Sequence, residues 1–448
     1  MTNTKLKLLL TLTAATALCV GYAAAQPRAP DAPAASAIKS IQRVSTNSTG
    51  AQIAVGATVA RISADGTKVG FLSRGTNLGG DANPSGYNHL YVKDLATGKV
   101  TRVDSSATGT AANGSVDNLW NFSPDGTRVV FSSAASNLVG NDTNYYNDVF
   151  EKTLATGAIR RLSVGSTGGQ ANNASYQPVY SRDRTKIAFS SYATNLVTGD
   201  TNGASDVFVK SLVNGAVTRV SVAPNGQQGN YYSGYPSFSP REDRIAFISY
   251  ATNLGPPDDA SSLSIFERSL GATNDMTMIN IRADGKQALY QSNWSPLWAP
   301  SGNAVLFVSA EDGIVKADNN HVLDIYQRVL PTKVTVLLSR TNAGGTLNNH
   351  SADPAYDGSG TIFAFSTMAN NITNDDSNGV FDVYLRDSVK KTTVRISTRA
   401  DGTQALNGGS RWPSLSRDGK KIVFTSTATN LVSGDTNGSE DVFLVTLP

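Results

Sequence analysis

Apolar and polar residues alternate along most of the chain in short runs, which is the period of a β-strand. Residues 166–223 illustrate the pattern. Asp183-Arg184 predicts the first hairpin of this segment, and Asn214-Gly215 predicts a type I′ turn before its last strand. Four strands, a to d, are expected at residues 179–181, 186–190, 206–210 and 217–221. Four antiparallel strands in a unit of this length indicate one blade of a β-propeller.

Three markers show that this unit is repeated seven times. A glycine in a polar stretch recurs every 58 or 59 residues, at Gly50, Gly109, Gly168, Gly226, Gly285, Gly344 and Gly402. A hairpin motif Ser-x-Asp-Gly is clearest at Ser63–Gly66, Ser123–Gly126 and Ser416–Gly419. An acidic residue followed by an apolar and an aromatic residue opens strand c at Asp148, Asp206, Asp324, Asp382 and Asp441. The fold class is therefore predicted to be all-β, a seven-bladed propeller of four-stranded antiparallel blades.

The two ends of the repeat region predict how the ring closes. The seventh unit stops at Leu447-Pro448, directly after its strand c. The missing strand d is found near the start, where Ile41–Ser45 matches the strand d sequence Thr218–Ser221. Pairing of this N-terminal strand with the last blade would remove both exposed sheet edges. We therefore expect residues 38–448 to form one closed propeller.

The repeats, with Ser-x-Asp-Gly followed by Asp-Val-Phe or Asp-Ile-Tyr, resemble the WD40-like repeats of TolB-type propellers. The resemblance covers roughly residues 41–448. It implies a periplasmic or secreted propeller with protein-binding relatives. TolB itself carries an α/β domain before its propeller, whereas only a short spacer is predicted here. The partners of TolB are therefore not carried over.

The first residues are typical of an export signal. Lys5 and Lys7 precede the apolar stretch Leu8–Val20, and Ala23–Ala25 offers a small-residue cleavage pattern. This predicts a signal peptide at 1–25 and a Pro/Ala-rich spacer at 26–37; the alternative is an uncleaved membrane anchor. The single cysteine lies within the signal, so the mature chain would hold no disulfide. Removal of Lys5 and Lys7 with the signal would lower the net charge from +3 to +1, and a near-neutral chain with scattered charge does not indicate nucleic-acid binding. We expect an exported monomer, periplasmic or extracellular, without a stable membrane anchor after cleavage.

The b–c and d–a connections are long and polar and share one face of the propeller, so function is expected there. The b–c loop repeats the spacing Asp-x-Asn-x-x-x-Asp, also at Asp318/Asn320/Asp324, while the units holding Asp81 and Asp258 lack it. Carboxylate and amide oxygens at this spacing suit Ca²⁺. The alternative is that they hold turns and the start of strand c. The candidate Ca²⁺ ligands are Asp142, Asn144, Asp148, Asp200, Asn202, Asp206, Asp376, Asn378, Asp382, Asp435, Asn437 and Asp441.

The start of each innermost strand should line the mouth of the central channel. Flat amphipathic rings beside charged residues would suit a peptide or a sugar. The alternative is that these rings pack between neighbouring blades. Tyr145-Tyr146 and Tyr231-Tyr232 would extend the same surface. The candidate ligand-binding residues are Trp120, Tyr176, Tyr235, Trp294, Asp353, Arg411 and Trp412.

No catalytic motif stands out in the sequence. The three histidines, His89, His321 and His350, fall in different units and lack the spacing of a zinc motif. No G-x-S-x-G elbow is present. We therefore expect a non-catalytic propeller that binds a protein or a glycan through the b–c/d–a face. The alternative is a carbohydrate-active lyase or glycosidase that uses acidic residues at the channel mouth.

Overall fold

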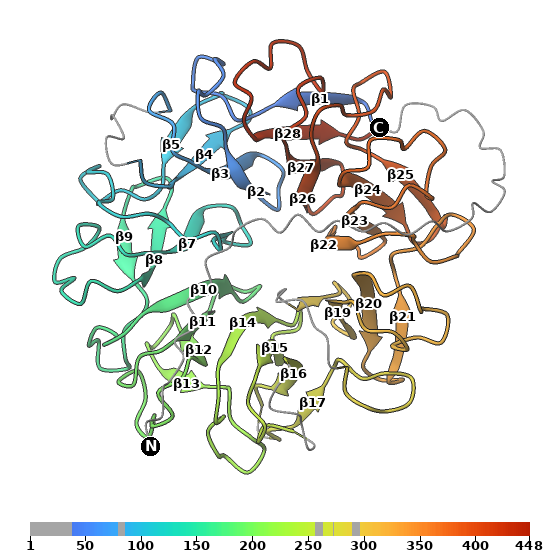
Figure 1. Cartoon of the computed structure of the whole chain (residues 1–448). Helices are drawn as coiled ribbons and strands as arrows, with labels where there is room; N and C mark the ends of the chain where they lie inside the picture. Colours follow the sequence, from blue (N-terminus) through green and yellow to red (C-terminus); the bar gives the residue numbers. More distant parts are fainter. Residues whose placement is uncertain (1–37, 79–85, 256–262, 272, 289–295) are drawn as a thin grey trace, which may run out of the picture. The chain divides into compact units, whose positions relative to one another are not determined.

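The computed structural model describes residues 38–78, 86–255, 263–271, 273–288 and 296–448. These residues contain 28 β-strands, which form seven four-stranded antiparallel sheets. The sheets are the blades of a propeller, with the first strand of each blade innermost (Figure 1). The predicted signal peptide and spacer lie outside the described ranges. Within those ranges, no helix is long and apolar enough to cross a membrane.

Blades 1 to 4 follow one another along the chain. Blade 1 contains β2 (Thr58–Ile62), β3 (Lys68–Ser73), β4 (His89–Asp94) and β5 (Val100–Arg102). Blade 2 contains β6 (Asn121–Phe122), β7 (Arg128–Ser133), β8 (Asp148–Thr153) and β9 (Ile159–Arg161). Blade 3 contains β10 (Ser175–Tyr180), β11 (Lys186–Ser191), β12 (Asp206–Ser211) and β13 (Val217–Arg219). Blade 4 contains β14 (Ser233–Phe238), β15 (Arg244–Ser249), β16 (Ser264–Ser269) and β17 (Met276–Met278).

Blades 5 and 6 repeat this order, and blade 7 combines the two ends of the described chain. Blade 5 contains β18 (Leu297–Trp298), β19 (Ala304–Ser309), β20 (Asp324–Val329) and β21 (Val334–Leu337). Blade 6 contains β22 (Ser351–Tyr356), β23 (Ile362–Thr367), β24 (Asp382–Asp387) and β25 (Thr392–Arg395). Blade 7 contains β26 (Ser410–Leu415), β27 (Lys421–Ser426), β28 (Asp441–Thr446) and β1 (Ser40–Arg43). The pairing of β1 with β28, from Ser40 with Thr446 to Arg43 with Phe443, confirms the predicted closure.

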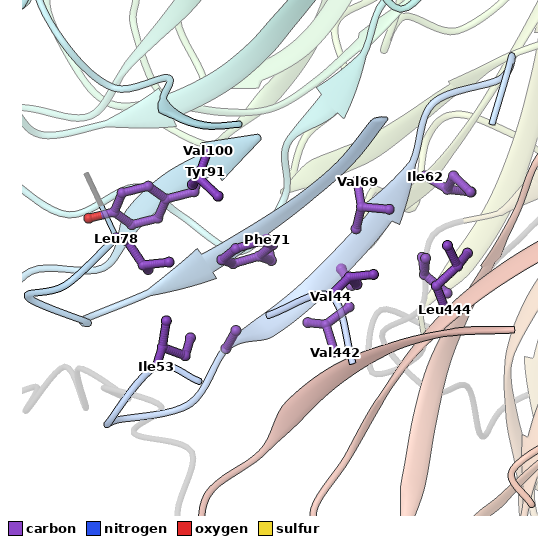
Figure 2. Packing of buried hydrophobic residues seen from close by; sticks show 13 residues of the cluster. Val44, Ile53, Ile62, Val69, Phe71, Leu78, Tyr91, Val100, Val442 and Leu444 are labelled. Atoms are coloured by element: carbon purple, nitrogen blue, oxygen red, sulfur yellow. The ribbon is translucent and has the colours of Figure 1, made fainter. Parts of the chain in front are cut away.

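The hydrophobic core lies between neighbouring blades. Successive side chains of a strand point to opposite faces of its sheet, so Phe71 belongs to the cluster shared with blade 7 and Leu72 to the cluster shared with blade 2. Figure 2 shows the first cluster, in which Val442 and Leu444 of β28 pack with Phe71 and Tyr91 of blade 1. This packing holds the closing blade to the first blade of the ring.

Turn chemistry fixes the hairpins between strands a and b. In blade 1, the Ser63 hydroxyl donates to Asp65 Oδ1 (2.5 Å) and accepts from the backbone N–H of Lys68 (2.9 Å). Gly66 takes a φ of 67°, the left-handed region that favours glycine. The predicted type I′ turn in blade 3 is wrong, because Gly215 has positive φ but Asn214 does not. The c–d connection there is a longer turn, closed by the N–H of Ser211 to the carbonyl of Ala216.

Candidate functional site

Five of the seven inner strands are interrupted by a bulge at the predicted mouth. The register with strand b shifts within β2, β10, β14, β22 and β26. At these bulges, residues other than glycine take positive φ: Val59, Gln177, Tyr235, Asp353 and Trp412. Proline follows directly in four of the five blades. Proline lacks a ladder donor and is tolerated at such bulges. Strained backbone of this kind is common at ligand sites.

The bulges are joined from blade to blade. The Gln177 side chain accepts a hydrogen bond from the Tyr235 backbone N–H of the next blade (2.6 Å). Asp353 likewise accepts from the Trp412 backbone N–H (3.4 Å). Its carboxylate is also paired with Arg411 Nε at 3.0 Å. The mouth is therefore a set of residues held in place by their neighbours.

Three of the predicted ligand-binding residues come together on blades 6 and 7. The Asp353 carboxylate is almost fully buried, and burial raises its pKa, although Arg411 opposes the rise. The Arg411 guanidinium lies 4.2 Å above the ring of Phe381 and 5.4 Å from the ring of Trp412. The Trp412 side chain remains 37% exposed. This group presents an aromatic ring and a cation to solvent side by side.

Trp412 lines an open cavity of about 420 Å³ at the junction of blades 7, 1 and 2. Val55, which is 54% exposed, contributes apolar surface. Arg74 and Glu440 contribute charge to the same lining, and Asn118 brings in blade 2. Burial raises the pKa of Glu440. The lining combines apolar side chains with polar and charged groups, and both kinds of group occur in ligand sites.

Two further aromatic candidates, Tyr176 and Tyr235, lie near a carboxylate that the sequence analysis did not single out. Asp117, next to Asn118, interacts electrostatically with both Tyr176 and Tyr235. Burial raises the pKa of Asp117. No repeat motif marks this residue in the sequence.

Two of the predicted ligand-binding residues, Trp120 and Trp294, are not found at the channel mouth of the described structure. Trp120 is fully buried in the cluster between blades 1 and 2, so it packs between blades as the alternative prediction stated, and it does not reach the mouth. Trp294 lies outside the described residues. Tyr145, Tyr146 and Tyr231 are exposed, whereas Tyr232 packs against Tyr250.

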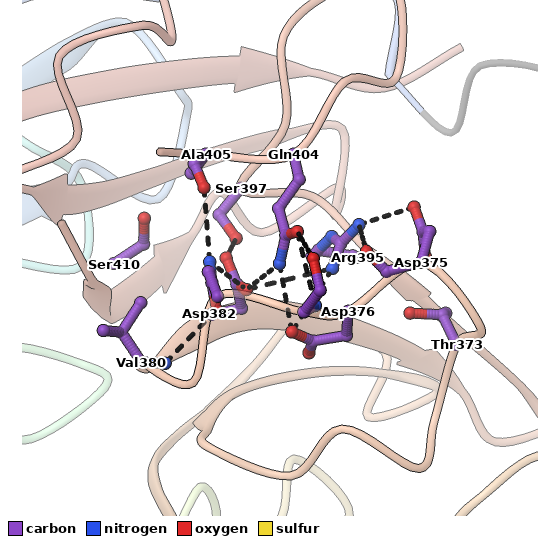
Figure 3. Close-up of polar contacts among 12 residues, drawn as sticks. Thr373, Asp375, Asp376, Val380, Asp382, Arg395, Ser397, Gln404, Ala405 and Ser410 are labelled. Atoms are coloured by element: carbon purple, nitrogen blue, oxygen red, sulfur yellow. Dashed lines mark hydrogen bonds and ion pairs between the residues drawn. The ribbon is translucent and has the colours of Figure 1, made fainter. Parts of the chain in front are cut away.

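The Asp-x-Asn-x-x-x-Asp loops form a second polar arrangement, which blade 6 shows in full (Figure 3). Asp382 accepts from the Ser397 hydroxyl (2.5 Å) and Asn378 (3.1 Å). Gln404 donates to Asp376 (3.0 Å), and Arg395 Nη1 lies 3.7 Å from Asp376 and 3.9 Å from Asp382. We call this arrangement the acid network of a blade.

The same acid network recurs in blades 2, 3 and 7. Each pair of aspartates there is bridged by one glutamine and faces one arginine, which are Gln170 and Arg161, Gln228 and Arg219, and Gln52 and Arg43. A calcium ion at these loops would have to displace the arginine. The arrangement therefore favours the structural alternative for these loops. The serine hydroxyl, rather than the aspartate itself, accepts the backbone N–H at the start of strand c.

Blades 1, 4 and 5 depart from this network. In blade 1, His89 opens strand c and pairs with Asp104 at 2.6 Å, while Asp104 accepts the Leu90 backbone N–H. In blade 4, the position that opens strand c and the position of its partner are occupied by the uncharged residues Ser264 and Asn280. In blade 5 the carboxylates of Asp318 and Asp324 remain, and burial raises their pKa to about 6 and about 7. The signal for these departures was present in the sequence: all three blades lack the Arg-x-Ser pair, and blades 1 and 5 also lack the Gly-x-Gln pair.

The described residues contain no group of three or more His, Cys, Asp or Glu side chains arranged to hold a metal ion. The histidines also have separate local roles. His89 is buried against Asp104, and His350 Nδ1 accepts the backbone N–H of Leu323. His321 is exposed beside Asp312. No pair of histidines is therefore placed together by these contacts.

Comparison with known proteins shows the fold. No family model matches the sequence, and no curated protein matches it. Among solved structures, an oligogalacturonate lyase from Vibrio parahaemolyticus is similar, with 15% identity, a TM-score of 0.54, and 91% of this chain and 93% of that chain covered. An oligogalacturonate lyase in complex with manganese is similar at 18% identity and a TM-score of 0.52, with the same coverage. A putative TolB from Agrobacterium tumefaciens matches at 17% identity over 63% of this chain and 80% of that chain, with a TM-score of 0.41.

At these identities the likenesses extend to the fold alone. The TolB-type resemblance of the repeats implied a propeller, and the seven four-stranded blades confirm it. The chain is a seven-bladed β-propeller closed by its N-terminal strand.

Proposed function

We propose that the protein is an exported, non-catalytic binding propeller that contacts a protein or a glycan at the channel mouth. The observation that carries the proposal is the exposed ring of Trp412 beside the Asp353–Arg411 pair, at the edge of a cavity of about 420 Å³. An amphipathic ring next to fixed polar groups suits the face of a sugar or a planar side chain. The proposed export rests on the signal pattern at residues 1–25.

A binding site of this kind predicts graded losses on substitution. The wild-type mature protein would be screened on a glycan array and a peptide array, together with Trp412→Ala. An aromatic contact contributes about 1 kcal/mol or more beyond its buried area, so binding should weaken by about tenfold. Tyr145→Ala is the matched control, because Tyr145 is 83% exposed in a b–c loop and does not line the cavity. Equal losses in the two variants would contradict the proposed site.

The second candidate function is a carbohydrate-active enzyme, and the specific observation in its favour is the likeness to two oligogalacturonate lyases over 93% of their chains. By analogy with those proteins, the substrate would be an acidic oligosaccharide, for which Arg411 and Arg74 offer cations at the mouth. A lyase forms an unsaturated sugar with strong ultraviolet absorbance. Incubation with oligogalacturonate therefore separates the two candidates: turnover that is abolished by one mouth substitution would establish the enzyme and refute the binding propeller.

A further inference from the structure

Blade 5 contains a buried pair of carboxylates for which the chain supplies fewer donors than in its sister blades. Strand pairing places Leu337 opposite Tyr326, as Arg395 is placed opposite Tyr384 in blade 6. The bridge between Arg340 and Thr346 likewise corresponds to that between Thr398 and Gln404. Blade 5 therefore has leucine where blade 6 has the network arginine, and threonine where blade 6 has the network glutamine.

The loss of both donors leaves one oxygen without a partner. Asp324 keeps the Ser339 hydroxyl at 2.5 Å and the Asn320 amide at 2.8 Å. The Oδ2 atom of Asp318 accepts the Tyr326 hydroxyl. The Oδ1 atom of Asp318 is buried without a hydrogen-bond partner, and the residue is only 3% exposed. In the described part of the chain, no Lys, Arg or His nitrogen forms an ion pair with either carboxylate.

The sister blades show where this unpartnered oxygen points. In blade 2, Asp142 Oδ1 and Asp148 Oδ2 both accept from a single atom, Gln170 Nε2, at 2.8 and 2.9 Å. The two carboxylates of an acid network thus converge on one point between the b–c loop and strand c. In blade 5 the corresponding oxygens belong to Asp318 and Asp324. Two converging carboxylates in a buried position require a positive charge to remain ionised.

We propose that the Asp318–Asp324 pair of blade 5 binds one calcium ion. Hard oxygen donors from two aspartates suit Ca²⁺, which readily completes its coordination with water and backbone carbonyls. The ion would take the part that Arg395 and Gln404 play in blade 6, linking the b–c loop to the start of strand c. The inference is independent of the ligand proposed for the channel mouth, because it rests on different residues.

The test compares calcium binding in the mature protein and in variants that exchange the two chemistries. Isothermal titration with CaCl₂ should detect a site in wild type that is lost in Asp318→Asn and in Leu337→Arg/Thr346→Gln. The double variant introduces the donors of blade 6, so it should keep the melting temperature of metal-free wild type or exceed it. The control Asp376→Asn alters the matching aspartate of blade 6 and should keep the calcium site.

Thermal unfolding gives a second readout. At a calcium concentration about 100-fold above the dissociation constant, the wild-type midpoint should rise by about 3 °C relative to chelator. Asp318→Asn and the double variant should show no such rise. The proposal is overturned if wild type binds no calcium at millimolar concentration. It is also overturned if calcium binding persists in Asp318→Asn. This single variant tests the site even if the double variant does not fold.

Discussion

Substitution of Asp441 tests whether the acid network of blade 7 holds the ring closed. Asp441 accepts hydrogen bonds from Ser45 (2.5 Å), Gln52 (2.9 Å) and Asn437 (3.1 Å). Ser45 and Gln52 are 396 and 389 residues away along the chain. The same side chain is therefore part of a blade and part of the junction between the two ends. We expect Asp441→Ala to weaken both.

The stability loss expected for Asp441→Ala depends on which hydrogen bonds its three donors keep in the variant. Gln52 still donates to Asp435 (2.8 Å), and Asn437 still donates to the Ile53 carbonyl (2.9 Å). The Ser45 O–H loses its acceptor, which costs about 1–3 kcal/mol for a buried group, and two further bonds are lost at roughly 0.5–1 kcal/mol each. The expected loss is about 3 kcal/mol. With an unfolding entropy of about 2.1 cal/mol/K per residue over roughly 400 residues, the midpoint should fall by about 4 °C.

The matched control is Asp206→Ala in blade 3. Asp206 has the same partners, Ser221 at 2.5 Å and Gln228 at 2.8 Å, but they are close in sequence. Calorimetry should give similar losses for both variants. Hydrogen exchange should differ: amides of β1 and of Val44 directly after it, whose N–H donates to the Val442 carbonyl, should lose protection only in Asp441→Ala. Equal protection of β1 in the two variants, or no stability loss in Asp441→Ala, would refute the reasoning.

Three further predictions concern the hairpins and the core. Arg184 holds a φ of 64° at a hairpin position that is glycine in five of the other six blades, and its ion pair is partly exposed, so Arg184→Gly should stabilise the protein by about 0.5–1 kcal/mol in urea unfolding. A Cβ on Gly70 would lie 2.3 Å from the Trp120 ring, so Gly70→Ala should destabilise by about 1–3 kcal/mol, with partial recovery when Trp120→Phe is added. Hydrogen bonds from Ser416 and the Lys420 N–H lower the pKa of Asp418 from its ordinary 3.8. The ionised Asp418 therefore stabilises the folded protein above pH 4, and this contribution is lost on acidification. Asp418→Asn should for this reason lose less stability than wild type between pH 7 and pH 3.

The fold could be predicted because its determinants are local and repeated. Period-two alternation marks each strand, and the hairpin motif sets each a–b turn through contacts two to five residues apart, as between Ser63, Asp65 and Lys68. The ring closure was predictable because Ile41–Ser45 repeats a strand that the last unit lacks. The failure at Asn214-Gly215 was also local, since a longer turn places a single residue at positive φ.

The candidate site was predicted less completely, because its geometry depends on register and on neighbouring blades. Trp412 stands four residues before the hairpin serine Ser416, whereas Trp120 stands three residues before Ser123. Since successive side chains in a strand point in opposite directions, this shift of one position moves a ring from the mouth into the core. The arginine and glutamine of each acid network were missed because they contact aspartates that are distant in sequence, 13 to 28 residues away in blade 2 and 383 to 389 residues away for Gln52 in blade 7.

The departures from the repeat are where an individual role for this chain should be sought. A charged residue buried in a blade is stable only with a matched partner, and four blades meet that requirement with the same arginine and glutamine. Blade 1 meets it with His89 and Asp104, and blade 4 avoids it with Ser264 and Asn280. Each of these is a complete local solution and requires nothing from outside the chain. Blade 5 retains the two acids but lacks the arginine and the glutamine, and Asp318 Oδ1 is buried without a hydrogen-bond partner, which is why the calcium proposal is made for this blade.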